Sequence, residues 1–95
     1  MDVKINAVNF KADERLNNFV TDKVMKLQHH ANGLLGAEVT LRVDKPESIK
    51  NKVADIRLMV RGNDLYASKQ ADSFEEAVML SIDALKSQVS KFKDK

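Results

Sequence analysis

The chain has 95 residues, of which 43% are hydrophobic and 32% charged, and we expect residues 1–95 to form a single small domain with one core. It has no cysteine, which excludes disulfides and thiolate zinc sites, and no apolar run reaches the ~18 residues of a membrane span, so a cytoplasmic location without membrane contact is expected. Sixteen Lys and Arg against fourteen Asp and Glu leave a net charge of +2, so total charge alone does not establish a nucleic-acid partner.

A strand and a helix are predicted at the start of the chain. Apolar and polar side chains alternate over residues 3–7, which is the pattern of a half-buried strand. Asp13 is a favourable N-cap residue, and apolar residues follow it at spacings of three and four, which predicts a helix from Asp13 to about Ala31. Asn32 and Gly33 tolerate the left-handed conformation that commonly ends a helix.

Two further strands are predicted in the middle of the chain. Alternation over residues 38–44 predicts the first of them, with Val43 in the inward row. Pro46 has no N–H for a sheet ladder, so this strand is expected to end near Asp44. The same alternation over residues 54–61 predicts the next strand.

A hairpin is predicted to connect that strand to a fourth one. Gly62 and Asn63 favour the positive φ angles of a two-residue turn. The fourth strand should then run from Asp64 to about Lys69, antiparallel to the third, with Tyr66 pointing outward.

The second helix is predicted to begin after Ser73, because Ser73 and Glu76 have the spacing of a capping box. The resulting order, β-α-β-β-β-α, predicts an α+β fold in which a four-stranded sheet carries both helices on one face and exposes the other face to water. The first two strands should be parallel, because a helix joins them. One apolar stripe is expected to run through this helix to the C-terminus, formed by Phe74, Val78, Ile82, Leu85, Val89 and Phe92.

No arrangement of residues typical of an enzyme is present. There is no nucleophile beside a base, no paired carboxylates and no phosphate-binding glycine loop. His29 and His30 are consecutive helix positions that point about 100° apart, so they cannot share one metal ion. We therefore expect a protein that is not an enzyme and that uses no cofactor, metal or small-molecule substrate.

The basic residues of the helices are more informative. Arg15, Lys23 and Lys26 fall on one flank of the first helix, beside its apolar stripe. Asp22 can pair with Lys26 across one turn, so a solvated face with one ion pair is the alternative interpretation. The second helix places Lys86 and Lys93 near one edge of its stripe and Lys91 near the other.

The exposed face of the sheet is predicted to carry arginines, with Arg57 and Arg61 on the third strand and Arg42 beside them. No recognition helix, zinc finger or RNP-type aromatic motif is present, so recognition of structured RNA through its shape and phosphates fits better than base reading. The alternative function is a protein-binding regulatory adaptor that uses the exposed sheet face. The alternative role of the arginines is cross-strand pairing with Glu38, Asp44 and Asp55.

Short motifs spread over the whole chain carry a resemblance to a known family. They are Val-Lys-Ile-Asn at 3–6, Phe-Val-Thr at 19–21, Gly-Asn at 62–63, Leu-Tyr-Ala-Ser at 65–68 and Ile-Asp-Ala-Leu at 82–85. Together they resemble the ribosome hibernation promoting factors, a family that includes the ribosome-associated inhibitor called protein Y. Because the chain ends at Lys95 without the second domain of long members, it resembles the short type.

The resemblance implies a fold like that of double-stranded-RNA-binding domains. It also implies a partner, the small ribosomal subunit with its ribosomal RNA, bound in the channel for messenger and transfer RNA so that idle ribosomes stay inactive. The oligomeric state is left open. The family's basic positions correspond to Lys23, Lys26, Lys91 and Lys93, and the residues themselves add Arg15, Lys86 and Arg57 as secondary contacts. Members often carry basic residues where this chain has Ala84 and Ser87, so part of the expected contact on the second helix is missing.

Overall fold

A computed structural model describes residues 2–29, 33–45, 47 and 49–93, and the side chains up to residue 90 within those ranges. The strands form one sheet in the order β1-β2-β3-β4, with β1 parallel to β2 and the other neighbours antiparallel. The predicted order and α+β class are therefore confirmed. The elements are β1 (Asp2–Val8), α1 (Glu14–Met25), the 3₁₀ helix η1 (Lys26–His29), β2 (Leu34–Val43), β3 (Lys52–Val60), β4 (Leu65–Ala71) and α2 (Phe74–Lys93).

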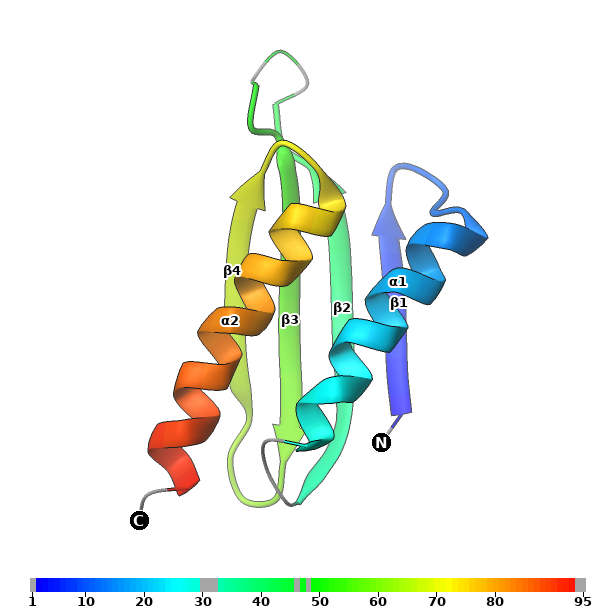
Figure 1. The fold of residues 1–95 in the computed structure, drawn as a ribbon. Coiled ribbons are helices and arrows are strands. Elements are labelled where there is room, and N and C mark those ends of the chain that lie inside the picture. The colour runs from blue at the N-terminus through cyan, green and yellow to red at the C-terminus, as the bar shows by residue number, and fades with distance from the viewer. Residues whose placement is uncertain (1, 30–32, 46, 48, 94–95) are drawn as a thin grey trace.

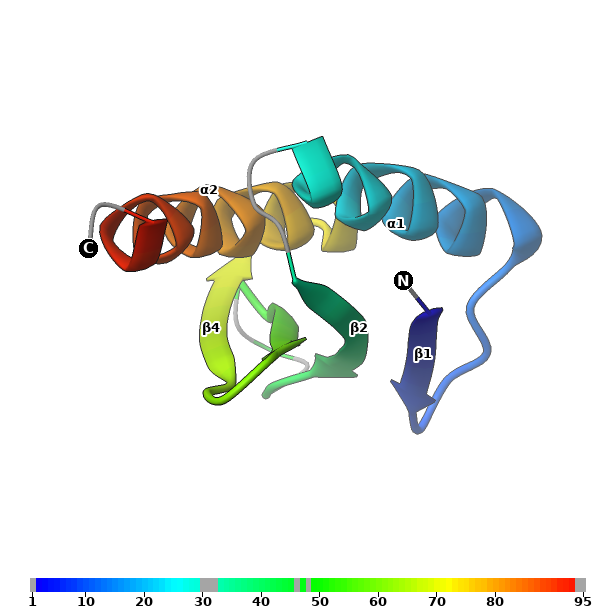
Figure 2. The same ribbon diagram turned by 90° about the horizontal axis from the view of Figure 1, so that it is seen from below.

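Both helices lie on the same face of the sheet, as predicted (Figures 1 and 2). They run in the same direction, so their N-terminal ends lie at one end of the sheet and their C-terminal ends toward the other (Figure 1). The core fills the space between the helix layer and the sheet, because each element turns one apolar side inward. Its largest fully buried side chains include Leu27, Leu41, Ile56, Leu58 and Leu85.

The predicted caps hold both helix starts. The Oδ1 atom of Asp13 accepts a hydrogen bond from the backbone N–H of Leu16 at 2.8 Å, and the Oγ atom of Ser73 accepts one from the N–H of Glu76 at 3.1 Å. Each bond satisfies a backbone donor that the first helical turn leaves without a partner. The caps thereby fix where both helices begin.

The first helix ends differently from the prediction. Its α-helical part stops at Met25 and tightens into η1, which continues to His29; such tightening is common at helix ends because the last carbonyls lack α-helical partners. Gly33 has a φ of +83°, so it adopts the predicted left-handed conformation. Ala31 and Asn32, where the helix was expected to end, lie outside the described residues.

The second strand also departs from the prediction. It begins at Leu34 instead of residue 38, because the pairing register with β3 shifts between Leu34 and Gly36 and interrupts the simple alternation. Val43, which was expected to face inward, is 41% exposed at the strand's last position. The rest of β2 alternates as expected between buried and partly exposed side chains.

The predicted two-residue turn at Gly62 and Asn63 is wrong. The N–H of Asn63 donates to the carbonyl of Val60 at 3.1 Å, so Arg61 and Gly62 are the central residues of the turn. Gly62 has a φ of +87°. Asn63 lacks the predicted positive φ, because Asn9 is the sole non-glycine residue with a positive φ in the described part of the chain. A positive φ at the third turn position is the type II pattern, which favours glycine there.

Candidate nucleic-acid interface

The facing flanks of α1 and α2 form one surface on the outside of the helix layer. The two helices contact each other, and Arg15 from α1 lines the same hollow as Glu75 from α2, which identifies the flank of each helix that faces its neighbour. Lys26 follows Arg15 by 26 − 15 = 11 positions, which at about 100° per residue returns it to within ~20° of the same direction. Lys26, the first residue of η1, therefore continues the flank of α1 that faces α2.

The opposite flank of α2 is fixed by a contact with the sheet edge. The Nε2 atom of Gln88 donates a hydrogen bond to the carbonyl oxygen of Tyr66 on β4 at 2.9 Å, so this flank faces β4. Lys86 precedes Gln88 by two positions, which corresponds to about 200° around the helix. Lys86 therefore lies on the other flank of α2, the one on which Glu75 lines the hollow shared with Arg15 of α1.

The described lysines and arginine of this surface keep their positive charge available. The Nζ atom of Lys23 lies 5.6 Å from the centre of the Phe19 ring, a cation–π contact that leaves the charge unneutralised. Arg15 and Lys86 make no ion pair with any described residue. We call Arg15, Lys23, Lys26 and Lys86 the basic helix flank.

Lys26 makes the ion pair that the alternative interpretation expected. Its Nζ atom lies 3.4 Å from Oδ2 of Asp22, but the two side chains are 57% and 62% exposed. Water and salt screen a pair this exposed, so it contributes little and a phosphate can replace the carboxylate. The pair therefore reduces the charge of the basic helix flank only slightly.

Two further candidates, Lys91 and Lys93, lie in the last turn of α2. Their side chains lie outside the described residues, so their contact role stays a prediction. The backbone places both positions at the C-terminal end of α2, where positive charge interacts favourably with the helix dipole.

The open sheet face offers much less free charge. Arg57 donates from Nε and Nη2 to Oδ2 of Asp64 at 3.0 and 2.5 Å, and its Nη1 lies 3.5 Å from Oε1 of Glu38. The hydrogen bond to Asp64 is the main reason that the pKa of Arg57 is raised above its ordinary value. Its role as an RNA contact stays a prediction, but its partners favour the cross-strand pairing alternative. The sequence pattern did not reveal Asp64 as a partner, because the turn that positions it was misassigned.

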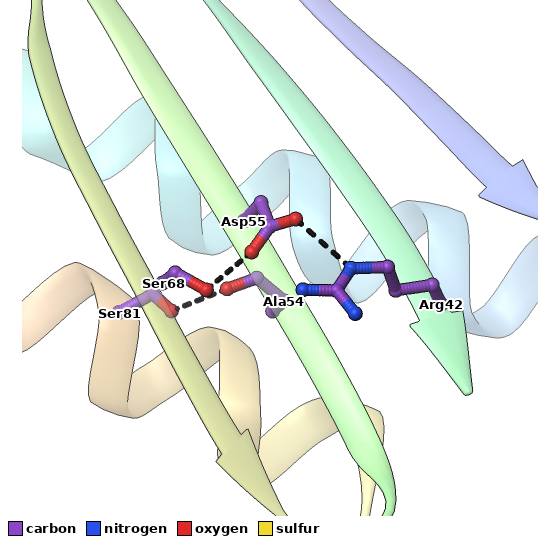
Figure 3. A network of polar contacts seen from close by, with 5 residues as sticks. All are labelled: Arg42, Ala54, Asp55, Ser68 and Ser81. Atoms are coloured by element: carbon purple, nitrogen blue, oxygen red, sulfur yellow. Dashed lines mark hydrogen bonds and ion pairs between the residues drawn. The ribbon is translucent and has the colours of Figure 1, made fainter. Parts of the chain in front are cut away.

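A second network on this face neutralises Arg42. Its Nε atom donates to Oδ2 of Asp55 at 3.2 Å, and the hydroxyl of Ser68 donates to the other carboxylate oxygen (Figure 3). Asp44, the third carboxylate expected to pair with these arginines, instead accepts a hydrogen bond from Gln70. Arg61 makes no ion pair within the described residues. Most charge on the open face is thus paired across strands.

Neither a metal centre nor a membrane helix is found in the part of the chain that the structure describes. No three His, Cys, Asp or Glu side chains there gather closely enough to bind a metal ion. None of the helices there has the length and apolar character that crossing a bilayer requires.

Comparison with known proteins gives a family match over nearly the whole chain. The model of the family described as sigma 54 modulation protein / S30EA ribosomal protein matches residues 3–95. The ribosome hibernation promoting factor of Escherichia coli K12 is 32% identical over 95 residues, which cover 100% of this chain and 96% of that protein. The protein of the same name from Azotobacter vinelandii is 26% identical, with 100% and 85% covered.

Solved structures share the fold. A ribosomal subunit interface protein from Coxiella burnetii superposes with a TM-score of 0.88 at 20% identity, with all of both chains covered. The N-terminal domain of Protein Y from Thermus thermophilus superposes with a TM-score of 0.83 at 22% identity, over 97% of this chain and 99% of that one.

Proposed function

The chain belongs to the family of sigma 54 modulation and S30EA ribosomal proteins, and from this membership we propose that it is a ribosome hibernation factor of the cytoplasm. It acts as a single domain that binds the small ribosomal subunit through ribosomal RNA. Its position there is the channel used by messenger RNA and the anticodon arms of transfer RNA. By occupying that channel it inhibits translation on idle ribosomes.

The observation that carries this proposal is the difference in free charge between the two faces. The basic helix flank presents Lys23 and Lys86 without a carboxylate partner among the described residues, whereas Arg42 and Arg57 on the sheet face are paired. Phosphates of folded RNA release condensed counterions when cations such as these approach, which drives binding without a large net protein charge. The helix layer is therefore the side that meets the RNA.

The proposed mechanism is steric and needs no chemical step. The helix layer fills space that messenger and transfer RNA must occupy, and phosphate contacts set its position. The sheet then supports the helices from behind, through the shared core. The adaptor alternative needs polar groups on the open sheet face that are free to bind a protein partner. There, however, Arg42, Asp55 and Ser68 already form hydrogen bonds with one another.

Co-sedimentation with purified ribosomal subunits tests the proposal. The wild-type chain should travel with small subunits and not with large ones, and Lys23→Glu combined with Lys26→Glu should abolish this while the circular dichroism spectrum stays native. A matched control exchanges two exposed charges away from the helix layer, Lys4→Glu on β1 with Arg61→Glu in the turn after β3, and should retain binding. Binding of the wild type to large subunits alone, or full binding by the Lys23/Lys26 variant, would refute the proposal.

A further inference from the structure

A hollow lies between the N-terminal ends of the two helices, next to the basic helix flank. Its volume is about 360 Å³, within the ~300–1,000 Å³ range of small-molecule sites. The loop before α1, the first turns of α1 and the first turn of α2 all contribute to it. Its lining includes Phe10, Lys11, Asp13, Arg15, Leu16 and Glu75.

One residue that lines the hollow is aromatic, and its ring is supported on one face by a second ring. The ring of Phe10 stacks on that of Phe74 with centroids 4.7 Å apart and planes 9° from parallel. Phe74 is the first residue of α2, and the core packs against both rings. An aromatic side chain fixed in this way loses little conformational entropy when a second flat ring stacks on it.

Three charged side chains around the hollow have no ion-pair partner among the described residues. They are Lys11, Arg15 and Glu75, and all three are exposed. Asp13 is different, because its carboxylate is engaged in capping α1. The hollow therefore combines an aromatic lining residue, two free cations and one free carboxylate, which match a flat ring, an anion and a hydrogen-bond donor respectively.

A nucleotide carries these three features on one molecule. We propose that the hollow binds a single unpaired guanine nucleotide of the bound RNA; this deepens the proposed function and rests on it. The base stacks on Phe10, the phosphate contacts Lys11 and Arg15, and the N1–H and N2–H groups of guanine donate to the carboxylate of Glu75. Guanine is favoured because its Watson–Crick edge presents two adjacent donors, whereas uracil presents one donor between two acceptors.

Titration of the free, isotope-labelled chain with mononucleotides tests the site without any ribosome. Amide signals of residues 10–16 and 75 should shift saturably with GMP, more weakly with AMP and CMP, and least with UMP. Ribose 5-phosphate reports the anion contact alone. Equal shifts with ribose 5-phosphate and GMP, or no saturable shift with any nucleotide, would overturn the proposal.

Two variants separate stacking from donor recognition. Phe10→Leu should weaken GMP binding by at least about fivefold, since stacking of a base on an aromatic side chain contributes roughly 1–3 kcal/mol. Glu75→Gln should remove the preference for GMP over UMP, whereas Glu76→Gln, an adjacent exposed carboxylate outside the hollow, should retain it. If Phe10→Leu unfolds the chain, the comparison of Glu75→Gln with Glu76→Gln still tests the proposal. An unchanged preference for GMP over UMP in Glu75→Gln contradicts the role of the carboxylate.

Chemical probing of ribosomes identifies the source of the nucleotide. One unpaired guanine should lose reactivity at its Watson–Crick edge when the wild type binds and regain it with Glu75→Gln, while co-sedimentation persists. Binding of GMP without any such protection assigns the site to free nucleotides and overturns the RNA assignment. If the ribosome is not bound at all but GMP binds, the proposed function fails and the hollow remains a nucleotide site, so the two failures are distinguishable.

Discussion

Arg57 on β3 and Asp64 in the following turn are joined by two hydrogen bonds, from Nε and Nη2 to the same carboxylate oxygen at 3.0 and 2.5 Å. On the other side of the molecule, Lys23 has an aromatic ring beside it instead of a carboxylate. Both faces therefore carry basic residues, but Arg42 and Arg57 on the sheet face are paired with carboxylates, whereas Lys23 and Lys86 in the helix layer have no carboxylate partner among the described residues.

Removal of two charges from each face should have unequal effects on binding. Lys23→Gln with Lys86→Gln should weaken affinity for the small subunit by roughly 10- to 100-fold, because each lysine loses a charge-assisted phosphate contact. The matched control, Arg42→Gln with Arg57→Gln, should change it by less than about threefold, since these arginines are already paired. Filter binding at fixed salt measures both, and equal losses would contradict the assignment of the RNA-facing side.

The salt dependence of binding should report the same contacts independently. The logarithm of the affinity should fall linearly with the logarithm of the salt concentration, and each lysine removed from the basic helix flank should reduce the slope by about 1. Isotherms at four or five potassium chloride concentrations give the slope. A slope near zero for the wild type would indicate an interface held by apolar burial.

Loss of the cap of α2 should destabilise the fold without removing any positive charge. Ser73→Ala deletes the acceptor of the Glu76 N–H and should cost about 1 kcal/mol of unfolding free energy, which for a domain of this size lowers Tm by about 4–8 °C. Ser90→Ala, at an exposed position of the same helix, is the control and should leave Tm unchanged or raise it slightly, because alanine is the better helix former. Thermal unfolding followed by circular dichroism measures both variants, and equal Tm values would show that the cap contributes nothing.

The buried hydroxyl of Ser81 should matter more than the exposed one of Ser68. Ser81 is fully buried and donates to the carbonyl oxygen of Ala54 at 2.9 Å, which ties α2 to β3 (Figure 3). Ser81→Ala should therefore cost about 1 kcal/mol. Ser68→Ala should stay within about 0.5 kcal/mol, because water replaces its bond to Asp55. Urea unfolding compares the two, and a larger loss for Ser68→Ala would show that the sheet-face network stabilises the fold.

The sequence predicted the helices and their caps correctly where one periodicity of apolar residues ran without interruption. Asp13 and Ser73 were identified as caps because each side-chain oxygen accepts a hydrogen bond from the backbone N–H three residues later, and this bond involves no distant part of the chain. Prediction failed where the pairing of strands determines the start of a strand or the position of a turn. The early start of β2 at Leu34 depends on a register shift against β3, and the turn at Gly62 depends on how β3 and β4 pair.

The candidate site shows the same division. Helical periodicity placed Arg15, Lys23 and Lys26 on one flank, since 3.6 residues per turn is a local property of the backbone. Whether their charges are free depends on which side chains other elements bring within reach. Glu38 reaches Arg57 because β2 pairs with β3 in the register that places these two residues opposite each other.

Composition, periodicity and capping thus establish the elements of this protein, their order and the side of each that is buried, because these follow from the geometry of short segments. The tertiary structure decided which helix flanks face each other, which cations are neutralised, and that a hollow forms where Phe10 meets Phe74. These properties arise from segments far apart in the chain, and burial of a shared core, which has no local signature, brings those segments together.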